Sequence, residues 1–255
     1  MVIGRCGAVL LLLALSCAAQ SDAPPPKDPF EALLDGLPAI TEAARETETY
    51  DVEEEQKPIG WGRLDLEARP GEKAGYGLHA HFVIVHGPET VSASLAADVD
   101  ARFRPSRVMI EQKVKQGEQV GWGRDTMEST AEGLSLIHTE DEGEPIRRAA
   151  TPAGPYVVGI EFLLPRLPRK SLDGATILEL DIQAGEVQKW TVKVLPLPQG
   201  RAAYEVKNAA SDATRQYGVD ANGRLEWMVQ PPFTFHHVAV KRWDELRKQF
   251  PDIDK

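Results

Sequence analysis

Apolar and polar residues alternate along most of the chain after residue 47, and this two-residue period predicts β-strands. Residues 176–182 place threonine, leucine and isoleucine at even positions, with acidic residues at 179 and 181 between them. Residues 190–194 and 204–207 alternate in the same way. Strands with one apolar and one polar face are typical of antiparallel sheets. The pattern therefore predicts a mostly β protein.

A hairpin is predicted at residues 217–227, where YGVDANGRLEW places Asn222-Gly223 between two apolar runs. This dipeptide suits a type I′ turn, because both central residues of that turn need positive φ. In the strand that follows, we expect Leu225, Trp227 and Val229 to face inward together.

An internal echo suggests two related hairpins in one sheet. The segment IGWGR at residues 59–63 recurs as VGWGR at residues 120–124, a shift of 61 residues. Each copy is followed by a turn and a second apolar run, so the hairpins are expected near 59–86 and 120–140. Two copies are too few for a solenoid.

Within each copy the apolar residues change phase, from Trp61 at an odd position to Leu64 and Leu66 at even positions in the first. A strand moves its apolar set to the other face only through an extra residue or a sharp coil. We therefore expect a bulge or bend near Gly62 and Gly123 that curls the sheet toward a half-barrel. The alternative is that these glycines make room for a packed helix.

Four segments depart from the strand pattern. Residues 156–167 (YVVGIEFLLPRL) are almost continuously apolar and form either a core strand or a short helix in the concavity of the sheet. Asp28-Pro29 can start a short helix, and residues 39–46 can add one or two helical turns. Residues 241–250 predict a C-terminal helix, with Trp243, Leu246 and Phe250 at helical spacing.

The first residues predict export. Residues 1–19 combine Arg5, a leucine-rich apolar core and small residues, which is the pattern of a secretory signal and too short for a membrane anchor. Cleavage after Ala19 competes with cleavage before Cys17, because LALSC at residues 13–17 resembles a bacterial lipobox. Residues 20–28 form a proline-rich tether, and residues 29–255 are expected to form a single β domain. The expected location is the periplasm or, as a lipoprotein, the outer membrane.

Charge and cysteine content exclude several classes of function. The formal net charge is −10 and no basic cluster stands out, so neither nucleic acid nor an anionic membrane is expected as the main partner. Contact with a membrane is expected only through an N-terminal lipid anchor. Cys6 and Cys17 are the only cysteines, which leaves the domain without a disulfide, a thiol nucleophile or a thiolate metal site.

Three segments together resemble uncharacterised bacterial periplasmic β-sheet proteins: IGWGR at 59–63, FLLPRLP at 162–168 and YGVDANGRL at 217–225. The resemblance extends by pattern over most of residues 47–240. The architecture of those proteins is in turn similar to the half-barrels of lipoprotein carriers and outer-membrane lipoprotein receptors. It implies a curved antiparallel sheet with a short helix or apolar segment on its concave side. None of the three segments is a catalytic signature.

Catalytic and metal-binding motifs were sought without success. No G-x-S-x-G segment presents a serine nucleophile. His79 and His81 share one strand face, but no H-E-x-x-H motif or cysteine pair supplies the further ligands that zinc needs. No phosphate-binding loop or dinucleotide fingerprint occurs. We therefore predict no enzymatic activity, no metal and no cofactor.

The aromatic residues suggest one candidate site. Tryptophan in a β domain is usually part of the core. The sharper hypothesis is an apolar pocket that holds an acyl chain, with an arginine at the head group. Its residues would come from the two echo strands and from the apolar segment: Trp61, Arg63, Trp122, Arg124, Tyr156, Phe162, Leu163 and Leu164.

These observations favour a non-catalytic bacterial envelope protein that serves as an interaction or structural module for another envelope protein. The first alternative is a periplasmic binding protein or carrier for a lipid, an acyl chain or a lipoprotein. The second is an unidentified hydrolase, motivated only by the unassigned histidines and carboxylates.

Lipidation at Cys17 is directly testable. The lipobox-like segment predicts that cells expressing the full chain incorporate radiolabelled palmitate into the protein, and that Cys17→Ser abolishes the label. Cys6→Ser serves as the matched control and should keep it. Absence of label on the wild-type protein would contradict the prediction.

Overall fold

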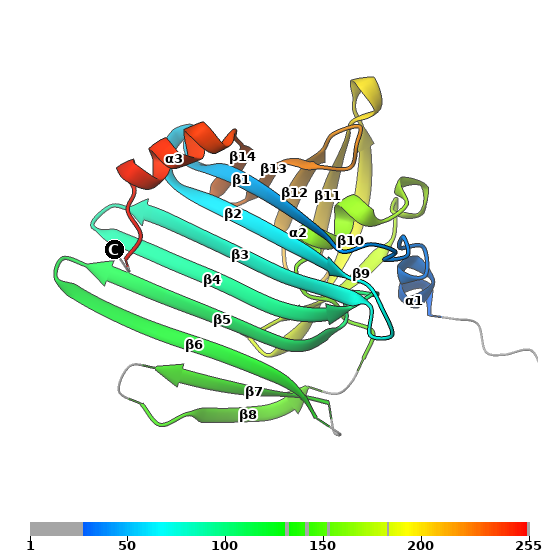
Figure 1. Cartoon of the computed structure of the whole chain (residues 1–255), viewed down its shortest axis with the longest axis horizontal. Coiled ribbons are helices and arrows are strands. Elements are labelled where there is room, and N and C mark those ends of the chain that lie inside the picture. The colour runs from blue at the N-terminus through cyan, green and yellow to red at the C-terminus, as the bar shows by residue number, and fades with distance from the viewer. Residues whose placement is uncertain (1–27, 131–132, 141–142, 152–153, 183, 254–255) are drawn as a thin grey trace, which may run out of the picture.

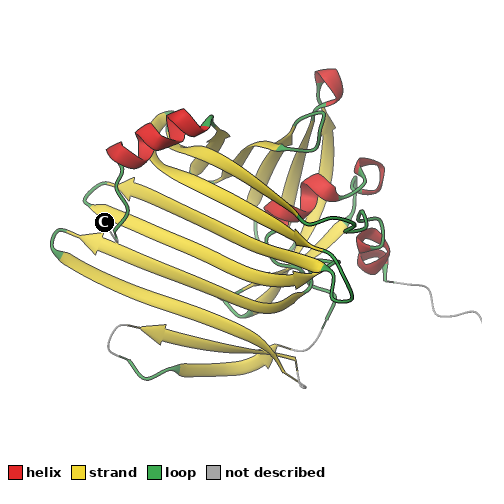
Figure 2. Cartoon of the chain, in the orientation of Figure 1, coloured by secondary structure: helices red, strands yellow, loops and turns green. Residues whose placement is uncertain are grey.

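The computed structural model describes residues 28–130, 133–140, 143–151, 154–182 and 184–253. These residues form one antiparallel sheet of 14 strands that curves strongly without closing (Figure 1). The predicted fold class is therefore confirmed: a mostly β protein built on a curved antiparallel sheet, with few and short helices (Figure 2). The leader, Cys17 and residues 20–27 of the tether lie outside the described residues.

The strands pair in the order β8-β7-β6-β5-β4-β3-β2-β1-β14-β13-β12-β11-β10-β9. Their bounds are β1 Ala44–Glu54, β2 Lys57–Arg69, β3 Gly75–His86, β4 Glu89–Asp100, β5 Pro105–Gln116, β6 Gln119–Thr130, β7 Gly133–Glu140, β8 Ile146–Thr151, β9 Thr176–Asp181, β10 Glu186–Pro196, β11 Ala202–Asn208, β12 Thr214–Val219, β13 Leu225–Gln230 and β14 Phe233–His237. The helices are α1 Pro29–Leu34, α2 Ile160–Leu163 and α3 Val240–Gln249, with short 3₁₀ turns at Leu164–Arg166, Arg169–Ser171 and Pro198–Gly200. The two echo segments lie in the hairpins β2–β3 and β6–β7.

The two edges of the sheet are joined through the chain that follows β8. Val157 forms a parallel bridge with Glu179 of β9: the Val157 amide donates to the Leu178 carbonyl (2.9 Å) and the Leu180 amide donates to the Val157 carbonyl (2.8 Å). Gly159, at φ +68°, then turns the chain into α2. This route places residues 156–167 inside the curve of the sheet (Figure 1).

The main hydrophobic core lies on the concave face, around α2. It joins apolar residues of both halves of the sheet to the buried side of α1, where Asp28 accepts a hydrogen bond from the Phe30 amide as the predicted helix cap. Of the two alternatives for residues 156–167, the structure shows the short helix in the concavity. This segment contributes eight side chains to the core, all at most 5% exposed: Tyr156, Val157, Val158, Ile160, Phe162, Leu163, Leu164 and Leu167.

A second, smaller core lies on the convex face under α3. Trp61 and Val83 of the sheet pack against Trp243 and Leu246 of the helix, as the helical spacing of residues 241–250 predicts. The Trp61 and Trp243 rings meet edge to face at 5.7 Å. The helix therefore covers the outside of β1 and β2 (Figure 1).

The expected bulges near Gly62 and Gly123 are wrong. The register of β2 shifts instead opposite Val52 and Glu53 of β1, where Ile59 is the extra residue, and β6 pairs regularly on both sides. The change of apolar phase has another cause. Leu64 and Leu66 face the concave core, whereas Trp61 faces α3. Both faces of β2 are therefore buried, and apolar residues occur at odd and even positions without any bulge.

Two other expectations need correction. Residues 39–43 form no helix and Ala44 begins β1, because the strand continues along β2 as far as Ala68. The hairpin at 217–227 exists, but its turn is not type I′, since Asn222 lacks positive φ and only Gly223 has it (+83°). Asp220 builds a longer loop by accepting the amides of Asn222 and Arg224, each at 2.8 Å.

Of the three residues of β13 expected to face inward, Leu225 lies in the core, but Trp227 and Val229 do not. The register with β12 shifts between Gly218 and Val219, so that Leu225 opposes Val219 and Trp227 opposes Gly218, which leaves Glu226 as the extra residue. Met228 faces the core in place of Trp227. The Trp227 ring covers Gly218, where an added Cβ would lie 2.0 Å from the indole nitrogen.

Gly60 and Gly121, equivalent in the echo, predict opposite responses to Ala. A Cβ at Gly60 would lie 1.9 Å from the Val83 carbonyl oxygen, whereas a Cβ at Gly121 meets nothing within 4 Å. We expect Gly60→Ala to lower the free energy of unfolding by about 1–3 kcal/mol through forced backbone movement. Gly121→Ala should leave it almost unchanged. Denaturant unfolding of both variants checks this, and equal losses would contradict the packing described here.

Candidate functional site

The structure separates the residues of the predicted pocket. Trp61 and Trp122 face the convex side, whereas Phe162, Leu163 and Leu164 fill the concave side. The sheet itself lies between the two sets, so they do not form one pocket. Trp61 and Trp122 do occupy equivalent places, because one cross-strand row runs Trp61, Val83, Ser92, Lys113, Trp122.

The convex residues are already engaged in the structure. Trp61 is 3% exposed beneath α3, and its indole N–H donates to the Phe250 carbonyl at 2.8 Å. Arg63 donates two hydrogen bonds to Asp65, at 2.7 and 2.8 Å. Arg124 pairs with Glu111 and lies 5.5 Å from the Trp122 ring. Neither arginine can meet a head group on the concave side.

The apolar segment fills its end of the concavity. Tyr156, Phe162, Leu163 and Leu164 are all at most 5% exposed. Beside Phe162 a small cavity of about 40 Å³ remains, room for very few waters. This end of the concave face is therefore core.

The other end of the concave face is apolar but only partly covered. Near α1 the inward residues are almost fully buried, as Leu78, Val99, Val108 and Met127 show at 5% exposure or less. Further along the same strands the inward residues are only partly buried. We name these the concave apolar patch: Phe82, Ile84, Val91, Ala93, Leu95, Ile110 and Val114.

The glycines of the echo bound this patch. One cross-strand row runs Gly60, Ile84, Val91, Val114, Gly121, and the next runs Gly62, Phe82, Ala93, Gln112, Gly123. The first copy is crowded, since a Cβ at Gly62 would lie 2.5 Å from the Phe82 ring. The second copy is open, since a Cβ at Gly123 would come no closer than 3.8 Å to another residue. On β6, therefore, the concave surface at Gly121 and Gly123 is not covered by any neighbouring side chain in close contact.

A polar trio borders the patch on β6 and β7. His138 Nδ1 lies 2.8 Å from Asp125 and its Nε2 lies 3.1 Å from Glu140. Hydrogen bonds to Glu140 and to Asp125 raise the pKa of His138 above its ordinary value. This edge of the patch thus carries a histidine that holds its proton more firmly than a free one.

A charged cluster lies beneath α2, inside the core. Glu179 of β9 accepts a hydrogen bond from Arg215 of β12 at 2.9 Å and from the Ile160 amide at 3.3 Å. The Arg215 guanidinium stacks 4.3 Å above the Trp190 ring. Glu161, in the first turn of α2, shares this environment. Sequence alternation had placed Glu179 on the polar face of its strand, and only the curvature of the sheet turns that face inward.

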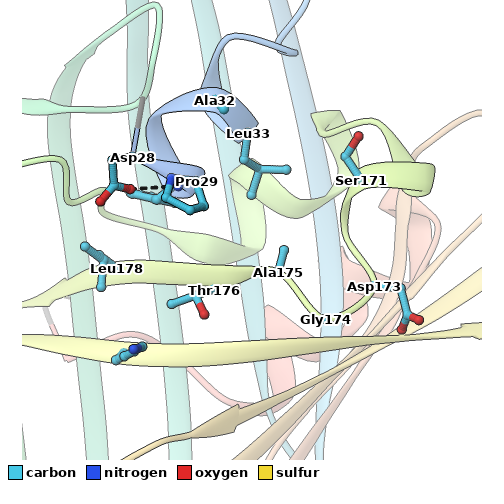
Figure 3. Close-up of a pocket in the computed structure, with 12 residues that line it drawn as sticks. Asp28, Pro29, Ala32, Leu33, Ser171, Asp173, Gly174, Ala175, Thr176 and Leu178 are labelled. Atoms are coloured by element: carbon cyan, nitrogen blue, oxygen red, sulfur yellow. Dashed lines mark hydrogen bonds between the residues drawn. The ribbon is translucent and has the colours of Figure 1, made fainter. Parts of the chain in front are cut away.

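A cleft of about 590 Å³ separates α1 from the outer face of β9 (Figure 3). Apolar residues of α1 line one side, and Ala175, Thr176 and Leu178 line the other. Its acids serve the fold, because Asp28 caps α1 and Asp173 accepts the Val194 amide at 2.9 Å. The cleft therefore shows no set of groups converging on a ligand.

His81, Ser92 and Asp252 meet on the convex face, although no sequence motif links them. His81 Nε2 lies 3.1 Å from Ser92 Oγ and 3.2 Å from Asp252, while the Ser92 hydroxyl donates to Asp252 at 2.9 Å. A catalytic triad needs the histidine to bridge serine and acid through its two different nitrogens. Here the same nitrogen faces both, and the acid binds the serine directly. Through these contacts Asp252 holds the chain after α3 against His81 of β3 and Ser92 of β4.

Three further histidines pair with single acids. His86 contacts Glu54 at 2.9 Å, His236 lies 3.8 Å from Glu53, and His237 contacts Glu48 at 2.8 Å. In the described parts of the chain, no three His, Asp or Glu side chains are placed to bind a metal ion. No helix among those residues has the length and hydropathy needed to cross a bilayer.

The geometry at Ser92 predicts a structural role. Ser92→Ala should lower the free energy of unfolding by about 1 kcal/mol, because it leaves two partly buried partners, His81 and Asp252, without their hydrogen bond to the serine. Fluorophosphonate probes, which label activated serines, should not modify the wild-type protein. The surface variant Ser106→Ala should unfold like the wild type. Labelling that disappears in Ser92→Ala would show that the serine is a nucleophile after all.

Comparisons with known proteins give little beyond this. No family model matches the chain, and no curated protein matches it. Among solved structures, a "Beta-barrel-like Protein of Domain of Unknown Function DUF1849" from Brucella abortus is similar, with 13% identity and a TM-score of 0.48 over 76% of this chain and 94% of that chain. At this level the likeness carries no information on function.

Proposed function

We propose that the protein is a non-catalytic binding module of the bacterial cell envelope, and that its concave apolar patch holds the acyl chain of a lipid or a lipoprotein. The observation that carries the proposal is the contrast along the concave face. Inward residues near α1 are buried, while those of the patch are aliphatic or aromatic and remain partly exposed.

The shape of the patch suits an acyl chain. Its rows run across β2 to β6, four inter-strand spacings or about 19 Å. Three successive inward positions of a strand extend it about 13 Å along the strands. All side chains of the patch are apolar, so an occupant gains by burying hydrocarbon and needs few hydrogen bonds. A contiguous apolar surface that stays partly exposed is a candidate binding site.

Arg63 and Arg124 lie on the convex face, so a head group bound at the patch would have to be recognised by other residues. The polar groups beside the patch are Gln112 and the trio of His138, Asp125 and Glu140. These can offer hydrogen bonds at the border, where an acyl chain would join its polar end. The placement in the envelope rests on the export signal predicted from residues 1–19, and a lipid on Cys17 would hold the patch close to a membrane.

Filling the open floor of the patch tests the proposal. Gly121→Phe puts a ring on the concave face, where an added Cβ meets no neighbour within 4 Å. We expect the wild-type domain to bind a fluorescent fatty acid and Gly121→Phe to weaken binding by about tenfold or more, equivalent to about 1.4 kcal/mol. Native mass spectrometry of the protein purified from cells should show lipid on the wild type only.

The matched control is Val120→Phe, one residue earlier in the same strand. Val120 faces the convex side and is 47% exposed, so this ring adds apolar area outside the patch. It should leave binding unchanged. Equal weakening in both variants, or no binding by the wild type, would remove the support for an acyl-chain ligand.

A further inference from the structure

Besides its apolar contacts in the core, the short helix α2 meets one buried acid on the neighbouring strand β9, Glu179. Glu179 binds residues 156–167 in two ways, because its backbone forms the parallel bridge with Val157 and its side chain accepts the Ile160 amide. Between these two contacts lies Gly159, with φ +68°. The segment therefore has a glycine at the point where it would turn away from β9.

The cluster contains two carboxylates and one guanidinium. Arg215 gives its hydrogen bond and ion pair to Glu179. Among the described residues, no lysine, arginine or histidine lies within ion-pair distance of Glu161. With both acids ionised, the cluster would carry one uncompensated negative charge at the border of the core, where Glu161 is only partly exposed, and this is costly.

The surroundings of Glu161 add no matching positive charge. From β12 it faces Arg215 and the Tyr217 hydroxyl, whose pKa burial raises far above its ordinary value. From β1 it meets the buried Tyr50, whose pKa is raised by burial and then by nearby carboxylates, Glu161 among them.

Water can still reach this acid. The small cavity beside Phe162 is lined by Glu161, by Glu46 and Glu48 of β1, by Arg166 of the segment 156–167 itself, and by Arg224 of the loop before β13. Arg166 is already paired with Glu46, and Arg224 lies 3.9 Å from Glu48. The cavity thus offers a path for a proton but no cation dedicated to Glu161.

We propose that Glu161 is a proton-controlled latch: a proton on Glu161 keeps the segment 156–167 seated on the concave face, and its loss loosens the segment about Gly159. The inference does not depend on any ligand at the concave apolar patch. It makes the filling of the concavity sensitive to the acidity of the medium.

The direction of the pH dependence follows from the charges. Burial, and then the charge of Glu179, raise the pKa of Glu161 from 4.5 to about 7. A carboxyl with a raised pKa stabilises the seated state fully below its ordinary value, and this contribution is lost as the pH rises through the raised value. The segment is therefore seated most firmly in acid and loosens as the pH rises from about 4.5 to about 7.

Hydrogen–deuterium exchange of peptides covering residues 156–167 tests the latch in the whole protein. After correction for the intrinsic pH dependence of exchange, we expect the opening equilibrium of the wild type to increase about tenfold between pH 5 and pH 8. In Glu161→Gln the same peptides should show no such increase, because the amide keeps the cluster neutral. Glu72→Gln, in the exposed turn between β2 and β3, should behave like the wild type.

A second measurement separates titration from mere packing. Carbon-13 NMR of the side-chain carboxyls should show Glu161 titrating near neutral pH in the wild type. In Glu179→Gln the midpoint should fall, because a like charge disappears and Arg215 is left to pair with Glu161. A purely structural role for Glu179 would not move it.

Two results would overturn the latch. One is a Glu161 midpoint close to its ordinary value of 4.5. The other is a midpoint near neutral pH combined with corrected exchange of residues 156–167 that stays constant from pH 5 to pH 8. Both readings come from the wild-type protein, so they decide the matter even where a variant fails to fold.

Discussion

The inner face of a strongly curved, open sheet must be covered, and this requirement shapes the rest of the molecule. Residues 156–167 meet it at one end, where Val157 extends the edge of β9 and α2 brings Phe162, Leu163 and Leu164 into the concavity. The gain comes from burying apolar side chains from both halves of the sheet at once. This burial also requires a buried polar group, because the Ile160 amide at the start of α2 needs a hydrogen-bond acceptor and Glu179 provides it. A charged group therefore sits inside the core, and the behaviour of Glu161 follows from it.

Most of the fold could be predicted from the sequence because a two-residue period is a local signal. Alternation in residues 176–182 and 190–194 needs no knowledge of the partner strand, and it identified strands that the structure contains. The apolar run at 156–167, ended by prolines, likewise indicated a short element in the concavity. The failures share another cause: they arose wherever a distant segment decided which face of a strand was buried. Leu64 and Trp61 looked like a change of phase only because the return of α3 to the convex face is invisible in the local pattern.

The charged and polar clusters lay beyond sequence reasoning for a related reason. Glu179 and Arg215 come from strands 36 residues apart, and Ser92 and Asp252 are 160 residues apart. Neither pair forms a motif with fixed spacing, so only the pairing of the strands brings them together. The turn at Asp220 shows the same limit on a smaller scale. The dipeptide Asn222-Gly223 indicated a hairpin, yet the side chain two residues before it selected a longer loop by accepting two amides.

The echo shows most clearly how one local sequence serves two purposes. In the first copy Trp61 is buried by α3 and Gly60 is pressed against the Val83 carbonyl, so both residues serve the core. In the second copy Trp122 lies on the convex face near Arg124, and Gly121 leaves open space on the concave side. The same five-residue pattern thus closes the concave face at β2 and keeps it open at β6. The apolar rows of the patch run from the crowded glycines of β2 to the open glycines of β6. The part of the concave face that stays accessible therefore depends on which neighbours cover each copy of the echo, because the two copies share nearly the same sequence.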